Sequence, residues 1–263
     1  MIIELLLFAI TGMLAGTAAG LLGIGGGMIV VPCLVFILSY YGIHLHVVMH
    51  VAVATSLAVM MFTATASIHS HHQRGNVLWP VFYQLIPGII VGVIMGAIFA
   101  DFLPTDVLKV IFAIFLILVA IRMFIIFVPK PHRQLPGPWP RRGFASLIGL
   151  KSGLLGVGGG ALTVPFLIWC NVPMKNASGI SAACTLPIAI TGTIVTIITG
   201  LNNTHNHFSL GYVYWPAVIT IALFSVLFVR LGARLQTMLP VNTVKRIFAV
   251  LLLIAAINLL VLS

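Results

Sequence analysis

A glycine-rich stretch occurs twice in this chain, as GLLGIGGGMIVVP at Gly20–Pro32 and as GLLGVGGGALTVP at Gly153–Pro165. Both copies lie within apolar sequence, and the charged residue nearest to either of them is Lys151. Because the motif recurs about half a chain further on, it predicts a chain built as two copies of one unit. Each copy also places several glycines together, which predicts an interruption of regular helix at that point.

The chain is too apolar to be a soluble protein. Only 6% of its 263 residues are charged and 61% are hydrophobic, whereas a soluble domain carries about 25% charged residues. Its apolar segments reach the length of about 20 residues that crosses a bilayer as a helix. The alternating pattern of membrane β-strands is absent. The sequence therefore predicts an all-α polytopic membrane protein with about 8–10 hydrophobic segments, broken or re-entrant at the glycine motifs.

Further matches between the two halves occur in the same order as the glycine motifs. GNVLWP at Gly75–Pro80 corresponds to GYVYWP at Gly211–Pro216, at nearly the same spacing as the two glycine motifs. We therefore predict one transmembrane domain made of two repeats, residues 1–128 and 143–263, which are joined by a basic, proline-rich linker at 129–142.

The distribution of Lys and Arg predicts opposite orientations for the two repeats. Cytoplasmic loops are enriched in these residues, and the linker holds four of them: Lys130, Arg133, Arg141 and Arg142. With the linker inside, ten of the thirteen Lys and Arg residues are cytoplasmic and only Lys109 is external. The formal net charge of +10 does not predict nucleic-acid binding, because the basic residues lie between apolar segments and not on one basic face.

The glycine motifs are the predicted centre of the functional site. Short helices are expected to begin directly after each cluster, and their free N–H groups and positive dipole ends favour an anion. In transporters with inverted repeats, such broken helices commonly form a binding site near the membrane midplane. The alternative is that the glycines only let helices pack closely. The predicted backbone contribution comes from Gly25, Gly26, Gly27, Gly158, Gly159 and Gly160.

Four side chains are candidates for the same site. Lys151 lies one to two helical turns before Gly156, and an ionisable residue inside a membrane is a functional candidate unless it extends to the membrane surface. Thr55, Ser56 and Ser181 recur at the same place in each repeat. Their hydroxyls suit oxyanion oxygens, or alternatively bond back to carbonyls of their own helices.

Carboxylates are nearly absent, which argues against a cation carrier. Glu4, Asp101 and Asp106 all fall at predicted segment ends. The histidine cluster HSHH at His69–His72 keeps a metal-cation transporter open as the alternative function.

Other chemistry is not indicated by the sequence. No Ser–His–Asp set, HExxH motif or carboxylate pair indicates an enzyme. The three cysteines predict neither a disulfide framework nor a metal site, and no cofactor is predicted.

The two glycine motifs, ATS at Ala54–Ser56 and GISAACTLPIAITG at Gly179–Gly192 together resemble the TauE/SafE family of bacterial and archaeal membrane permeases, also called sulfite exporters. The resemblance covers essentially the whole chain. It implies an inner-membrane carrier for small sulfur-containing or organic anions such as sulfite, thiosulfate, sulfoacetate or sulfonates. The serine of the family's usual GTSA maps onto Ser181, where Ile180 replaces the threonine.

The expected function is therefore a secondary transporter or facilitator of small anions that works by alternating access between inverted repeats. The expected location is a bacterial or archaeal plasma membrane, with the linker cytoplasmic. A small anionic substrate and membrane lipid are the expected partners, and a second copy of the chain is a candidate partner.

Overall fold

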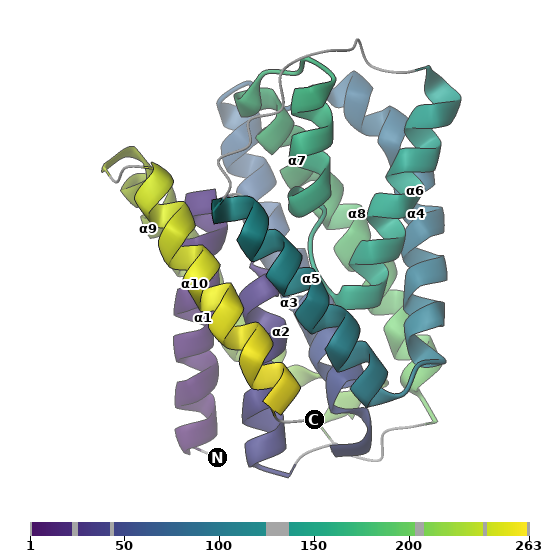
Figure 1. The fold of residues 1–263 in the computed structure, drawn as a ribbon, viewed down its shortest axis with the longest axis vertical. Helices are drawn as coiled ribbons and strands as arrows, with labels where there is room; N and C mark the ends of the chain where they lie inside the picture. Colours follow the sequence, from purple (N-terminus) through teal and green to yellow (C-terminus); the bar gives the residue numbers. More distant parts are fainter. Residues whose placement is uncertain are drawn as a thin grey trace.

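The computed structural model describes residues 2–22, 26–42, 45–124, 137–202, 208–238 and 241–261, which form a bundle of helices (Figure 1). In chain order, the α-helices are α1 (Ile2–Leu22), α2 (Gly27–Tyr40), α3 (Val48–Gln73), α4 (Trp79–Asp101), α5 (Thr105–Phe124), α6 (Pro138–Leu155), α7 (Gly160–Trp169), α8 (Met174–Gly200), α9 (Trp215–Met238) and α10 (Val241–Val261). A 3-10 turn, η1 (Leu45–Val47), precedes α3, and the short strands β1 (Ser209–Leu210) and β2 (Val213–Tyr214) precede α9.

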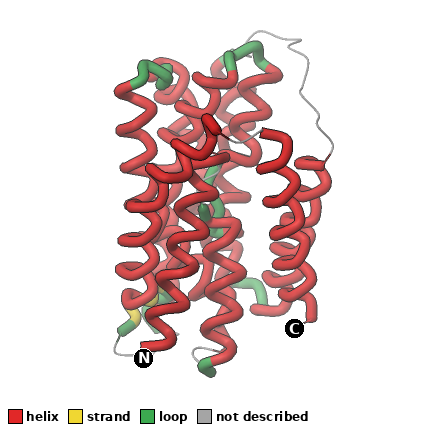
Figure 2. The backbone as a smooth tube through the Cα atoms, turned by 90° about the vertical axis from the view of Figure 1, so that its left-hand side faces the viewer, coloured by secondary structure: helices red, strands yellow, loops and turns green. Residues whose placement is uncertain are grey.

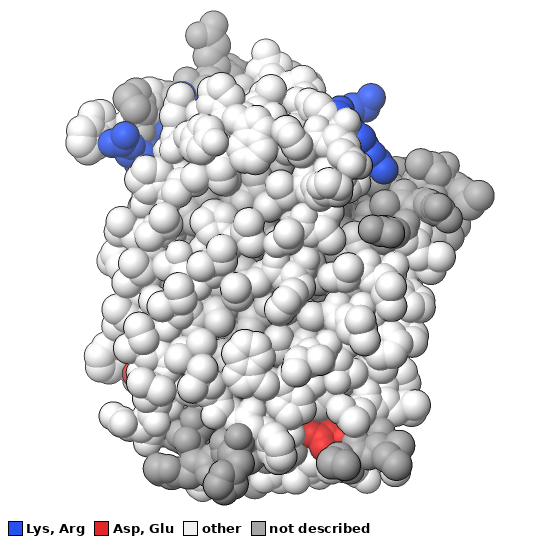
Figure 3. Space-filling model, turned by 180° about the vertical axis from the view of Figure 1, so that it is seen from behind, with Lys and Arg blue, Asp and Glu red and all other residues white. Residues whose placement is uncertain are grey.

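Five of the described helices, α1, α3, α4, α5 and α8, are long and apolar enough to cross a membrane. Shorter apolar helices lie at α2 and α7 and within α9 and α10. In the view from behind, white, uncharged residues cover the middle of the surface, with Lys and Arg at one end and Asp and Glu towards the other (Figure 3). This is the surface that a bilayer requires, so the predicted all-α polytopic membrane fold is confirmed.

Helices α3 and α8 lie at the centre of the bundle and pack against each other. The first half of α3, from Val48 to Met60, is buried without interruption. Around this centre, α1 packs along α9, α4 packs along α6, and α5 packs along α10. Figure 1 shows α5 and α10 side by side across the front of the molecule.

Glycines set the close approach of the outer helix pairs. On α4, a Cβ added at Gly92 or Gly96 would collide with a backbone carbonyl of α6, that of Ser146 or Leu150. On α1, a Cβ added at Gly12 would collide with a backbone carbonyl of α9. Small residues let membrane helices approach backbone to backbone, which replaces the hydrophobic driving force that lipid does not supply.

The helix boundaries repeat in the same way as the sequence motifs. Helices α2 and α7 begin at equivalent glycines of the two glycine motifs, Gly27 and Gly160. Helices α4 and α9 begin at equivalent tryptophans of the two GxVxWP segments, Trp79 and Trp215. The N-terminus lies at one end of the bundle, whereas α6, the first helix of the second half, starts near the opposite end (Figure 1).

Two local features differ from the sequence-based expectation. Helix α6 begins at Pro138, ahead of the predicted start of the second repeat at Gly143, because proline suits the first turn of a helix, where its missing N–H costs nothing. A hairpin pairs Ser209 with Tyr214, although the prediction contained no strand. Its turn contains Gly211 with φ 55°, a backbone conformation that glycine adopts at no steric cost.

Candidate functional site

The two glycine motifs meet inside the bundle. Gly27 opens α2, and a Cβ added there would lie 2.6 Å from the carbonyl oxygen of Gly156 in the second motif. Gly156 is equally enclosed, since its own added Cβ would lie 2.8 Å from the backbone of Val53 on α3. The structure therefore places the start of α2 against the loop that leads from α6 into α7. Gly25 lies outside the described residues.

Irregular backbone surrounds this contact. Helix α6 ends at Gly156, which has φ 63°, and α7 starts at Gly160, so 156–159 is loop. All four loop residues are buried, and Figure 2 shows loop backbone within the bundle at about mid-height. On the other side, Gly26 caps α2 with φ 66° and accepts bonds from the N–H groups of Ile29 and Val30. Buried loop of this kind is tolerated at membrane depth only because protein encloses it.

The two candidate hydroxyls of the first repeat, those of Thr55 and Ser56, bond to other segments and not back to their own helix. Ser56 Oγ on α3 donates to the carbonyl oxygen of Gly156 over 2.9 Å. Thr55 Oγ1 accepts from the backbone N–H of Tyr214 in β2 over 3.1 Å. Both side chains are fully buried. Ser181 on α8 is also fully buried, but its hydroxyl has no hydrogen-bond partner within the described residues.

Lys151 turns towards the buried loop that follows α6 and not towards the start of that helix. Its Nζ donates to the carbonyl oxygen of Gly158 over 3.2 Å and lies 5.0 Å from the ring centroid of Phe115 on α5. Gly158, Gly159 and Gly160 are all buried beside it. The predicted residues thus form two neighbouring groups around one loop, with Gly27 and Ser56 at its first residue and Lys151 near its last.

The histidine cluster does not assemble a metal site among the described residues, where no three His, Cys, Asp or Glu side chains gather. His69 Nε2 lies 3.0 Å from Nε2 of Gln73. The ring of His72 packs edge-on against Trp79.

Two polar residues that the sequence did not single out lie at the start of α7. Arg122 on α5 donates through Nη1 to the carbonyl oxygen of Ala161 over 3.1 Å. Thr163 is fully buried, and its hydroxyl has no hydrogen-bond partner within the described residues. In the sequence, Arg122 resembles an ordinary basic residue at a helix end, and nothing in the pattern distinguishes Thr163 from other membrane threonines.

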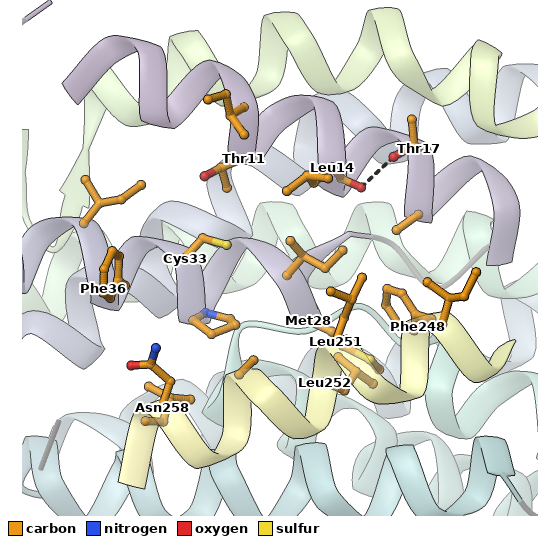
Figure 4. Close-up of a pocket in the computed structure, with 18 of the residues that line it drawn as sticks. Thr11, Leu14, Thr17, Met28, Cys33, Phe36, Phe248, Leu251, Leu252 and Asn258 are labelled. Carbon is orange, nitrogen blue, oxygen red and sulfur yellow. Dashed lines mark hydrogen bonds between the residues drawn. The ribbon is translucent and has the colours of Figure 1, made fainter. Parts of the chain in front are cut away.

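A cavity of about 480 Å³ opens between α1, α2 and α10. Its wall is apolar apart from a few groups such as Thr11, Thr17 and Asn258 (Figure 4). The described lining contains no Lys, Arg, Asp or Glu. It therefore suits apolar groups and offers no charge to an anion.

The apolar spans and the enclosed loop define the class as a polytopic α-helical membrane protein. The family model of the sulfite exporter TauE/SafE matches residues 8–259. The chain therefore belongs to the TauE/SafE family.

Relatives agree with this assignment over most of their length. A protein of Haemophilus influenzae named a probable membrane transporter is 35% identical over 257 residues, which is 97% of each chain. A probable membrane transporter of Methanocaldococcus jannaschii is 31% identical over 88% of this chain and 85% of its own. A third, from Bacillus subtilis, is 25% identical over 94% of each chain. No solved structure matches the chain. The protein is thus a multi-pass membrane protein of a transporter family.

Proposed function

We propose that the protein is a secondary transporter or facilitator of small anions, which works by alternating access between two inverted repeats. The observation that carries the proposal is the contact of Gly27 with Gly156, in the loop to which the half-buried amine of Lys151 bonds. It places the start of α2 against the loop that leads from α6 into α7. Helix starts carry partial positive charge and free N–H groups, so a loop between two of them favours a negative ligand.

The charge balance of the chain supports an anion. Its only three acidic side chains are engaged elsewhere: Tyr214 donates to Glu4, Tyr212 donates to Asp101, and Asp106 pairs with Lys109. Among the described residues, Lys151 therefore has no carboxylate partner, although a buried charge requires one or its equivalent. An anionic substrate would supply it.

Alternating access is supported by reciprocal packing of the two halves. Helix α1 packs on α9, and its counterpart α6 packs on α4, the counterpart of α9. Each half can therefore adopt the arrangement that the other half has. Such an exchange of conformations is the usual basis of alternating access in inverted repeats. We further propose that the basic linker end of the molecule faces the cytoplasm of a bacterial or archaeal cell.

The proposed substrates are small sulfur-containing oxyanions, organosulfonates or carboxylates. The sulfite exporter description of the family supports the first of these, whereas the relatives' names say only that they are membrane transporters. No described cluster of side chains offers a metal cation a set of ligands.

Uptake by proteoliposomes tests the proposal. Labelled sulfite, methanesulfonate and acetate are offered to the purified protein, with Ni²⁺ and Zn²⁺ as the comparison. We expect saturable uptake of at least one anion. Gly159→Ala should reduce this uptake, because the methyl group added to the enclosed loop would lie 3.0 Å from Thr163 Oγ1 on α7. Gly143→Ala is the matched control, since no described atom lies within 4 Å of a Cβ added there. Uptake of the metals without any of the anions would contradict the proposal.

A further inference from the structure

Cations from two different helices converge on the start of α7. Lys151 on α6 donates to the carbonyl of Gly158, and Arg122 on α5 donates to the carbonyl of Ala161. These carbonyls belong to residues only three apart in the chain, Gly158 in the loop and Ala161 in the first turn of α7. The two positive charges therefore share one short piece of backbone.

This arrangement places positive charge where a helix least favours it. A helix N-terminus is itself partly positive, so cations are ordinarily found at the opposite end. The three acidic side chains of the chain are all bonded to groups elsewhere, so Arg122 also lacks a carboxylate partner within the described residues. The excess of positive charge at the start of α7 therefore has no counter-charge among these side chains.

The hydrogen bond from Arg122 to Ala161 has a structural role, which explains the position of Arg122. It leaves most of the donors of the guanidinium unused. The carbonyl of Ala161 would normally accept from the residue four positions later, which is Pro165 and has no N–H. Arg122 supplies the missing donor. A guanidinium has five N–H donors, so this bond fixes the group at the first turn of α7 and leaves others to face a ligand.

An uncommitted buried hydroxyl lies at the same turn. Thr163 is fully buried, and Oγ1 has no hydrogen-bond partner within the described residues. The hydroxyl faces Gly159, where an added Cβ would lie 3.0 Å from it. A buried hydroxyl without a partner costs free energy unless a ligand or water completes it.

The matching place in the first half lacks all of this charge. When the repeats are aligned on their shared motifs, Lys151 corresponds to Ala18, Phe115 to Leu251 and Arg122 to Asn258. All three counterparts line the apolar cavity between α1, α2 and α10, whose Leu251 and Asn258 are labelled in Figure 4. The shared scaffold therefore does not require the two cations, which surround the short helix of the second half alone.

We propose that Arg122 and Lys151 form a two-cation oxyanion site at the first turn of α7, completed by the hydroxyl of Thr163, in which Arg122 gives preference to doubly charged anions. This inference rests on the proposed anion transport and names a residue that determines its specificity. Arg122 is the more exposed of the two cations, so it meets the anion first, and Lys151 holds it against the enclosed loop. A guanidinium suits this role because its planar fork binds two oxygens of one oxyanion.

The test compares a dianion with a monoanion of similar chemistry. The purified protein in detergent is titrated near neutral pH with sulfite, which is then partly the dianion, and separately with methanesulfonate. Thermal stabilisation is recorded in each titration. Arg122→Gln removes the charge and keeps an N–H donor on a shorter side chain. We expect it to raise the sulfite concentration needed for half-maximal stabilisation by about tenfold and to change that for methanesulfonate much less. Arg122→Lys keeps the charge and should retain most of the preference for sulfite.

The control is Lys175→Gln, which removes a positive charge from an exposed position at the start of α8. If Arg122→Gln weakened stabilisation by both anions equally, or by neither, the role of Arg122 would be overturned while anion transport stayed in place. Absence of stabilisation by both anions in the unaltered protein would count against the proposed function itself, and the two failures are therefore distinguishable.

Discussion

Ser56 donates a hydrogen bond to the carbonyl oxygen of Gly156 over 2.9 Å, and so ties the central helix of the first half to the glycine motif of the second. Both groups are buried. Gly156 is the left-handed residue that ends α6, so its carbonyl is not used by a continuing helix. The bond therefore fixes the loop against which α2 and α7 begin.

Replacing Ser56 by alanine should loosen this contact. The carbonyl of Gly156 would lose its donor in a buried place, which costs about 1–3 kcal/mol. Thermal unfolding in detergent measures the loss. Ser146→Ala is the control, because Ser146 bonds to the carbonyl of Arg142 in its own helix, near the surface. Equal stability of the two variants would show that water or another group replaces the bond.

A methyl group at Gly92 should separate α4 from α6. The added Cβ would collide with the carbonyl of Ser146, and overpacking of a close contact costs about 1–3 kcal/mol. Gly143→Ala, on the open side of α6, should be neutral or stabilising by up to about 1 kcal/mol, because alanine restricts the unfolded chain. Thermal unfolding of both variants checks the difference. A stable Gly92→Ala protein would mean that the two helices can move apart without cost.

Much of the helix pattern could be predicted from the sequence. The end of α1 at Leu22 and the start of α7 near Ala161 follow from the limits of apolar segments and from the glycine clusters between them. These are local properties, which is why one sequence is sufficient to predict them. The enclosed loop after Gly156 was predictable for the same reason, since a cluster of glycines does not favour continuous helix.

The pairing of particular groups was not predictable. That Ser56 reaches Gly156 depends on how α3 and α6 pack, and no local pattern encodes this distance. Arg122 resembled a residue that extends to the membrane surface, because only the packing of α5 brings it to the carbonyl that Pro165 leaves free. The hairpin at Gly211 was not predicted, because its two strands are too short to show an alternation of apolar and polar residues.

Replacing Thr55 by valine should free the hairpin that precedes α9. Thr55 Oγ1 accepts from the N–H of Tyr214, and valine has the same shape without the acceptor. In this variant the phenol of Tyr214 should still donate a hydrogen bond to Glu4, which it does over 3.1 Å. Burial and the charge of Glu4 raise the pKa of Tyr214 to about 12, so the phenol keeps its proton.

Hydrogen exchange over 209–216 measures the change. Loss of about 1–2 kcal/mol should speed exchange of the Tyr214 amide by roughly 5- to 30-fold. Thr65→Val, which removes a bond to the carbonyl of Met61 on the exposed side of α3, is the control and should leave this segment unchanged. Unaltered exchange in Thr55→Val would mean that the hairpin is held without this bond.

Lys151 should be needed for transport and not for folding. Within the described residues its amine contacts a carbonyl and an aromatic ring but no carboxylate, and a buried charge without a partner destabilises the protein that holds it. Lys151→Met keeps a flexible chain of similar length and removes the charge. We therefore expect unchanged or higher thermal stability, together with a fall of at least about tenfold in anion uptake by proteoliposomes.

Lys175→Met makes the same substitution at an exposed lysine at the start of α8 and should lower neither quantity. If Lys151→Met unfolded more easily while each folded molecule transported normally, Lys151 would be a structural residue that holds Gly158, and the anion would bind elsewhere.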